Sequence, residues 1–124
     1  MNGKTEYLIS TDVKFGPLER VDVAELERTC KHDWFNQTLC KVNDCVVRLG
    51  VLKGEFHWHR HANEDEFFYV VRGRLVIDLE GRTIELSSNQ GTLVPKGVIH
   101  RTRASERTVV LMVEAATVCP TGDD

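Results

Sequence analysis

The chain has 124 residues, of which 16 are basic and 19 acidic, so its formal net charge at pH 7 is −3. This length predicts a single domain, which buries about two-thirds of the surface that the unfolded chain exposes. The slight acidity argues against nucleic acid or an anionic membrane as a partner. No apolar run approaches the ~20 residues needed to cross a bilayer, and residues 1–6 do not resemble a signal peptide. We therefore expect a cytoplasmic protein.

The cysteines are expected to be reduced thiols. None of them is arranged as Cys-x-x-Cys, and the four are Cys30, Cys40, Cys45 and Cys119. In a chain without a secretion signal, such residues are usually packed as small apolar side chains.

The first third of the chain is expected to hold an arm, one helix and a strand pair. Residues 1–21 are polar and irregular, with a weak strand signal at 7–9. Asp22 followed by a glutamate three residues later predicts a helix N-cap, with the helix ending near Thr29. Strands are expected at 34–39 and 45–52, joined by a turn at 43–44.

From residue 55 onward the pattern is one of short strands separated by turn residues. The strands are expected at 66–71, 74–79, 82–86, 92–94, 98–102 and 108–113. Leu75, Ile77 and Leu79 alternate and should face a core, whereas residues 119–124 are expected to fray. Many short strands and one helix predict an all-β sandwich or barrel.

Three histidines and one glutamate are spaced so that a β-framework brings them together. His59 and His61 are two residues apart and would face the same way in a strand. Glu66 opens the next strand, which a hairpin would fold back beside them, and His100 follows a later turn. Imidazole and carboxylate ligands suit a divalent transition metal better than calcium or magnesium. They do not choose among Fe, Mn, Ni, Co, Cu and Zn.

Two segments of the chain resemble the two sequence motifs of the cupin superfamily. The first contains Gly54, His59, His61, Glu66 and Gly73, and its first gap is one residue shorter than usual. The second contains Asn89, Pro95, Gly97, His100 and Ala104. Asn89 stands where the family has glycine, and asparagine tolerates the positive φ of such a turn. Ala104 stands where the family has asparagine.

The resemblance implies the architecture and the site. It predicts one cupin domain over residues 1–124, folded as a jelly roll, or double-stranded β-helix barrel, whose core spans 45–114. It also implies one divalent transition metal held by His59, His61, Glu66 and His100. An N-terminal arm of this kind often pairs with a second subunit, so a homodimer is expected.

His57 has two interpretations. It shares the parity of His59 and should face the interior, where an imidazole with an ordinary pKa of ~6.5 could act as a general base. The alternative is a structural histidine bonded to a backbone carbonyl, and this alternative is slightly favoured.

Other charged side chains are expected to be solvated. Arg48 is a weak candidate for holding an anionic substrate, and a solvent-facing position is favoured for it. Arg101 and Arg103 should point away from the metal, and a second set is expected at the surface: Arg72, Arg74 and Glu64. An apolar set on the face opposite the ligands suggests a dimer interface: Trp58, Phe67, Tyr69 and Val71.

Two functions remain open from the sequence. The first is a metal-dependent enzyme that acts on a small polar metabolite, with oxygenase, isomerase, epimerase or lyase chemistry. The second is a non-catalytic binding or sensor module whose metal stabilises the fold. The absence of a recognisable DNA-binding motif weakens the sensor alternative, and fold alone does not decide function.

Overall fold

The computed structural model describes residues 7–123, so residues 1–6 of the expected arm lie outside it. Its one α-helix within this range is α1 (Val23–Thr29). The strands are β1 (Leu8–Ser10), β2 (Phe35–Val42), β3 (Cys45–Glu55), β4 (Glu66–Arg72), β5 (Arg74–Leu79), β6 (Arg82–Ser87), β7 (Gly91–Val94) and β8 (His100–Ala115).

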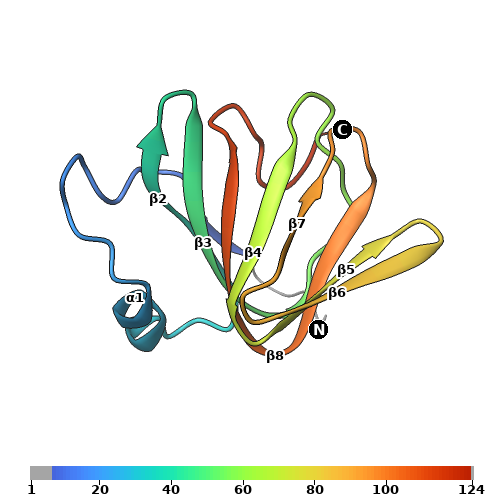
Figure 1. Ribbon diagram of the computed structural model, residues 1–124, viewed down its shortest axis with the longest axis horizontal. Coiled ribbons are helices and arrows are strands. Elements are labelled where there is room, and N and C mark those ends of the chain that lie inside the picture. Colours follow the sequence, from blue (N-terminus) through green and yellow to red (C-terminus); the bar gives the residue numbers. More distant parts are fainter. Residues whose placement is uncertain (1–6, 124) are drawn as a thin grey trace.

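The strands form an open barrel organised around β8. The main path of paired strands is β1-β2-β3-β8-β4-β7, and the β5–β6 hairpin joins through a separate pairing between β5 and β8. In Figure 1, β2 and β3 lie on the left, β4 runs through the middle, and the β5–β6 hairpin extends to the right. This arrangement confirms the predicted jelly roll with one short helix.

The long strand β8 differs from the prediction of two separate strands. The expected break between 98–102 and 108–113 does not occur, because residues 103 and 104 remain paired. Arg103 lies opposite both Glu55 and Val76, and Ala104 lies opposite Gly54. A single strand therefore runs from one side of the barrel to the other.

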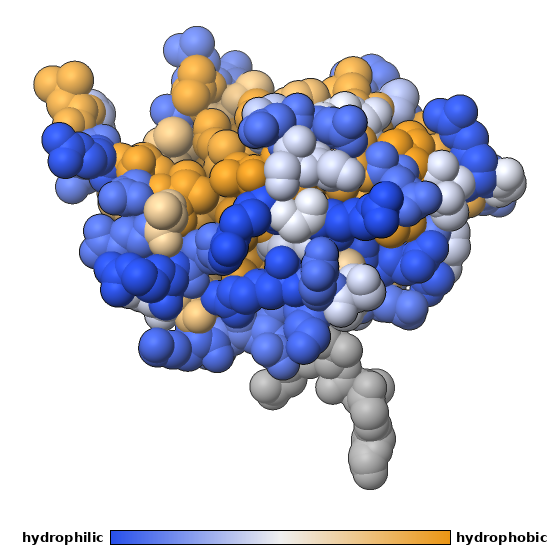
Figure 2. All heavy atoms as spheres, turned by 60° about the horizontal axis from the view of Figure 1, so that its bottom comes forward, coloured by the Kyte–Doolittle hydropathy of each residue, from blue (hydrophilic) through white to orange (hydrophobic). Residues whose placement is uncertain are grey.

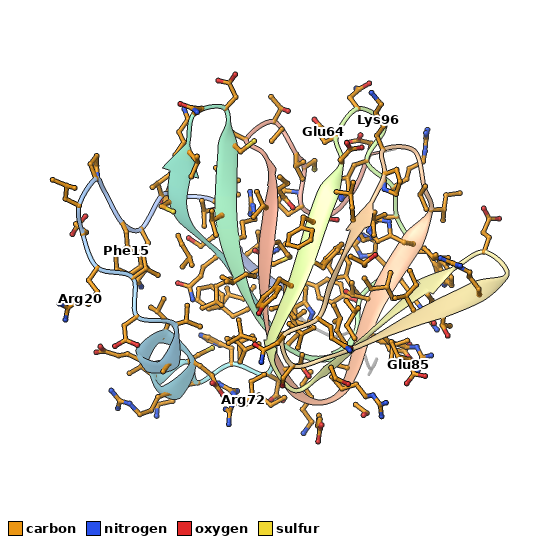
Figure 3. All side chains as sticks on the ribbon, in the orientation of Figure 1. Phe15, Arg20, Glu64, Arg72, Glu85 and Lys96 are labelled. Atoms are coloured by element: carbon orange, nitrogen blue, oxygen red, sulfur yellow. The ribbon has the colours of Figure 1, made fainter. Side chains whose placement is uncertain are left out.

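Two apolar layers lie on opposite faces of β3 and the second half of β8. The barrel interior holds a cluster that includes Trp34, Leu52, Phe56, Phe68, Val110 and Met112. A second cluster on the outer face is built on Leu39, Leu49, Val51 and Val109, and the arm and α1 cover it with Phe15, Val21, Val23 and Leu26. The labelled Phe15 in Figure 3 marks the arm beside this outer face. Strand β3 is thus buried on both sides.

The helix cap forms as the sequence predicted. The Asp22 side chain accepts a hydrogen bond from the backbone N–H of Glu25, with a distance of 3.1 Å between Oδ1 and N. Such a cap satisfies one of the backbone donors that a helix leaves unpaired in its first turn. The helix then ends at Thr29, as expected.

Gly73 is held in a conformation that excludes a side chain. Its φ is +98°, and a Cβ at this position would lie 2.6 Å from Oγ1 and 2.9 Å from Cα of Thr108. We expect Gly73→Ala to lower the free energy of unfolding by at least about 2 kcal/mol, because strain and overlap add. Urea denaturation measures this loss, with Gly81→Ala as the control. Gly81 also has a positive φ of +84°, but a Cβ there meets no atom within 4 Å. An equal loss of unfolding free energy in Gly73→Ala and Gly81→Ala would show that overlap with Thr108 adds nothing to the strain.

The structure confirms the turn conformation predicted for Asn89 and corrects the prediction for the C-terminal segment. Asn89 has a φ of +68°, as its place in the motif requires. The expectation that residues 119–124 fray is wrong for 119–123, which pack onto the barrel. Asp123 donates its backbone N–H to the carbonyl of Arg60 over 2.8 Å and accepts at Oδ2 from the N–H of Ala62 over 2.7 Å.

Across residues 7–123, no helix has the length and apolarity that crossing a membrane would take.

Candidate metal centre

The four predicted ligands come together at one point in the barrel. One ligand atom from each of His59, His61, Glu66 and His100 lies within 4.8 Å of the others. Glu66 is the first residue of β4 and His100 the first of β8, while the other two histidines lie in the connection between β3 and β4. A backbone bridge between His59 and His100, with two N–H···O distances of 2.9 Å, fixes the two imidazoles side by side.

Hydrogen bonds fix which nitrogen of two histidines is free. Nδ1 of His59 lies 3.0 Å from the carbonyl oxygen of His57, and Nδ1 of His100 lies 2.9 Å from that of Val98. Because a carbonyl oxygen can only accept, both Nδ1 atoms carry the hydrogen in the neutral rings. Nε2 of each ring is then an unprotonated donor of electrons, which is the form that binds a metal.

Several buried polar atoms at this point have no partner. Among the described residues, Nε2 of His61, Nε2 of His100 and Oε1 of Glu66 are buried without a hydrogen bond. Oε1 of Glu66 lies 3.5 Å from the first nitrogen and 3.4 Å from the second. Leaving such atoms unpaired is costly, and one cation shared among them would satisfy all three. The residues therefore fit a divalent transition metal.

The electrostatics of the cluster favour the ligand forms of His59 and Glu66. Burial lowers the pKa of His59 to about 4, so the ring is neutral at pH 7. Burial alone would raise the pKa of Glu66, but the nearby ring nitrogens of His100 and His61, at 3.4 and 3.5 Å, together with the neighbouring Glu114 carboxyl, outweigh burial and hold the pKa below its ordinary value. The pKa of His61 is raised. Burial, the largest influence, acts to lower it, but the Glu66 carboxylate, 3.5 Å away, outweighs burial.

A buried acid–base pair behind Glu66 was not foreseen from the sequence. The carboxyl group of Glu114 contacts that of Glu66, and burial together with this neighbour raises the pKa of Glu114 to about 10. Nε of Arg48 lies 3.2 Å from Oε2 of Glu114. The only available signal was the alternation of β8, which continues from Val110 through Met112 to position 114.

The solvent-facing position expected for Arg48 is wrong. Its side chain is 4% exposed and points into the barrel. The strand shows no alternation from which this could be read, because α1 and the arm bury its other face as well.

The remaining charged side chains follow the expectations more closely. Arg101 and Arg103 both bind Asp78, at 2.8 and 2.7 Å from their Nε atoms, rather than the cluster. Arg72 is largely exposed and pairs with Glu27, as its place near α1 in Figure 3 suggests. Arg74 is likewise exposed. Glu64, labelled at the upper rim in Figure 3, is only partly solvated, because its Oε2 accepts from Oγ1 of Thr117 over 2.8 Å.

His57 lies at the rim of the site and not in the interior. Regular strand structure stops at Glu55, so the parity argument that placed His57 beside His59 does not apply. Its ring is exposed, and Nε2 lies 2.6 Å from the carbonyl oxygen of Thr121. This geometry matches the structural alternative, while a role as general base stays a prediction.

The C-terminal segment covers the cluster. A Cβ on Gly122 would lie 2.5 Å from Cβ of His59, which shows how closely the backbone approaches that ligand. Pro120 lines a narrow pocket, with a volume of about 30 Å³, that reaches His59 and Glu66. The other walls of this pocket are mostly apolar: Trp34, Asn36, Leu52, Phe56, Phe68, Thr102 and Met112.

We expect His57→Ala to loosen this cover without removing a ligand. The variant loses the contact with Thr121, so a metal bound in wild-type protein should be released to a chelator several times faster, while equilibrium metal content stays near wild type. Stopped-flow release into excess chelator measures the rate. His32→Ala, whose imidazole lies elsewhere against Phe35, is the control. An unchanged release rate would contradict the covering role.

Comparison with known proteins agrees with the fold and the motifs. The sequence model of the cupin domain family matches residues 46–114 of this chain. The Bacillus subtilis protein YdbB is 48% identical over 80 residues, which are 64% of this chain and 71% of that protein. The polyketide synthase CurC of Streptomyces cyaneus is 47% identical over 45 residues, or 36% of this chain and 29% of that protein.

A solved structure extends the similarity over most of the barrel. A cupin-2 domain protein from Shewanella frigidimarina superposes with a TM-score of 0.73 at 29% identity, covering 77% of this chain and 93% of that one. The family match spans more than half of the 124 residues and includes all four clustered side chains. The chain belongs to the cupin family.

Proposed function

We propose that this cupin is a metal-dependent enzyme for a small metabolite with a polar, oxygen-bearing end. The observation that carries the proposal is a narrow, largely apolar pocket that reaches two members of the cluster, His59 and Glu66. Four protein ligands leave two positions open on a six-coordinate ion, as a catalytic metal needs. When bound, the metal would polarise a substrate oxygen or activate water or dioxygen. Iron, manganese, nickel and zinc are the proposed candidates.

The pocket lining supports a refined substrate class. Trp34, Phe56 and Phe68 present aromatic surface, so the body of the substrate is carbon-rich rather than polar throughout. The relative that is named a polyketide synthase is consistent with a carbon-rich substrate. Asn36 lines the same pocket, and its Oδ1 is buried without a partner. This amide would orient a hydroxyl or amine of the substrate.

The experiment tests for an open position on the metal. Chelator-stripped protein is loaded with Co²⁺ and its visible absorption spectrum is recorded as catechol is added, a ring-bearing probe with two oxygen donors. The expected result is a saturable spectral change in wild type and a curve at least fivefold weaker in Asn36→Leu. Gln37→Leu is the control, because that neighbouring side chain does not line the pocket. A bound metal whose spectrum ignores the probe would favour a metal that only stabilises the fold.

We also propose that the protein is a homodimer. Leu93, Phe67 and Val113 lie side by side in register on β7, β4 and β8 and are 54%, 37% and 39% exposed. They continue the outer apolar layer where the arm and α1 end, and Figure 2 shows apolar side chains gathered over one part of the surface. A second copy of the chain would cover this row. Trp58 is not part of it, because its ring stacks under Arg101, 5.2 Å from the guanidinium carbon.

Sedimentation equilibrium tests the dimer. Wild type is expected to be dimeric at micromolar concentration, and Phe67→Glu is expected to be monomeric because it places charge in the centre of the row. Ile99→Glu is a matched control, since Ile99 is similarly exposed at 40% but lies outside the row. A monomeric wild type would refute the proposal.

The cytoplasm is the proposed compartment. All four cysteines are free thiols, of which Cys119 is exposed and the others are partly buried. Free thiols persist in reducing compartments.

A further inference from the structure

Three buried charged side chains form a chain that leads to the metal cluster. Glu114 on β8 lies directly opposite Glu66 on β4 in the strand register. Arg48 on β3 lies one step diagonally from Glu114, because Val46 is the residue opposite Glu114. The side chains of Arg48, Glu114 and Glu66 are 4%, 1% and 8% exposed, and Nε of Arg48 lies 3.2 Å from Oε2 of Glu114. All three therefore interact within the barrel.

Stability does not explain this arrangement. Two carboxyl groups directly opposite each other on paired strands are unfavourable, and burying a charged group costs several kcal/mol even when a partner is present. Buried ion pairs can often be replaced by well-packed apolar residues without loss of stability. The neighbouring interior positions Val110 and Met112 are apolar, so the strand readily accommodates such residues. The charged cluster thus points to a role at the site.

We propose that Glu114, held by Arg48, is a positioning residue for the ligand Glu66. Oε1 of Glu66 faces His61 and His100, while the carboxyl group is also in contact with Glu114. The Glu114 contact fixes the rotation of the Glu66 carboxyl, so that one oxygen is directed toward the metal. Groups that hold a metal ligand in this way commonly contribute 10- to 100-fold to metal affinity. This inference rests on the proposed metal centre.

The experiment separates the effect of the side-chain length of Glu114 from the effect of its charge. Glu114→Asp keeps the carboxyl but withdraws it by one methylene, whereas Glu114→Gln keeps the reach and can still hydrogen bond to Glu66. The affinity for Co²⁺ is measured by competition with a chelator, together with the visible spectrum of the Co²⁺ protein and the melting temperature of the metal-free protein. We expect the Asp variant to bind about 10- to 100-fold more weakly with a shifted spectrum, and the Gln variant to stay within about threefold of wild type with an unchanged spectrum.

The outcomes distinguish this inference from the metal centre itself. Wild type that binds no metal would overturn the metal centre. If wild type binds metal, two results would overturn only the role of Glu114. In the first, the Asp variant binds metal as tightly as wild type; in the second, the Asp and Gln variants lose metal affinity equally. Arg48→Lys provides a second test if the Asp variant does not fold. It keeps the charge but lacks the planar donor fork, and unchanged metal affinity and spectrum in this variant would also overturn the proposal.

Discussion

Replacing His59 with alanine is expected to weaken metal binding at least 100-fold, while the same change at His57 leaves the affinity within about twofold of wild type. The two residues are separated by one position, but only His59 has a ligand atom in the cluster. Its Nε2 is unprotonated, because Nδ1 donates to the carbonyl of His57. The backbone carbonyl remains in His57→Ala, so that variant preserves the orientation of the ligand.

Elemental analysis of both purified variants, with chelator competition for the affinities, measures this difference. The melting temperature should fall less on chelation in His59→Ala than in wild type, since a bound metal stabilises the folded state by mass action. Equal metal content in the two variants would show that His59 is not a ligand.

Replacing Arg48 with methionine is expected to lower the free energy of unfolding of the metal-free protein by about 3–5 kcal/mol. Methionine fills similar space, so the loss comes from charge. The two carboxyl groups of Glu66 and Glu114 remain buried without the guanidinium that lies 3.2 Å from the second of them. Burial and the neighbouring Glu66 raise the pKa of Glu114, and Arg48 lies against this pair to compensate the negative charge that the two carboxyl groups carry together.

Urea denaturation in the presence of a chelator measures the loss, with Arg74→Met as the matched control. Arg74 also pairs with a glutamate, but both of those side chains are 58% exposed, so a change within about 0.5 kcal/mol is expected there. In the double variant Arg48→Met/Glu114→Leu most of the stability should return, because the second change removes the carboxyl that lost its guanidinium partner, while Glu66 keeps its neighbours His61 and His100. A loss of unfolding free energy in Arg48→Met as small as that in Arg74→Met would show that Arg48 does not compensate the charge of the buried carboxyl groups.

The motif spacing predicted the cluster because the two motifs also indicate the fold, whose backbone pairing brings their histidines together. His59 and His100 are joined by backbone hydrogen bonds, and Gly97, at the turn before His100, has a φ of +82° and donates its N–H to the carbonyl of His61. The helix was equally readable, since its cap depends on contacts within four residues. Short-range rules are sufficient for the helix, whereas the cluster was predicted through the resemblance of both motifs to those of the cupin superfamily.

The features that the sequence did not reveal depend on long-range packing. Arg48 is buried because its strand has the barrel on one side and α1 with the arm on the other, which no local pattern records. The C-terminal segment is ordered by contacts with residues about 60 positions earlier, such as Ala62. His57 was misplaced because regular alternation ended two residues before it.

The most direct test of the metal centre is calorimetric titration of chelator-stripped wild-type protein with Zn²⁺ and, under reducing anaerobic conditions, with Fe²⁺. The four converging side chains predict one site per chain for at least one of these ions, and His61, whose pKa is raised, contributes to the protons released on binding. No saturable binding of either ion, in protein whose melting curve shows it to be folded, would contradict the metal centre. The barrel would then bind its ligand through the buried histidines and Asn36 alone.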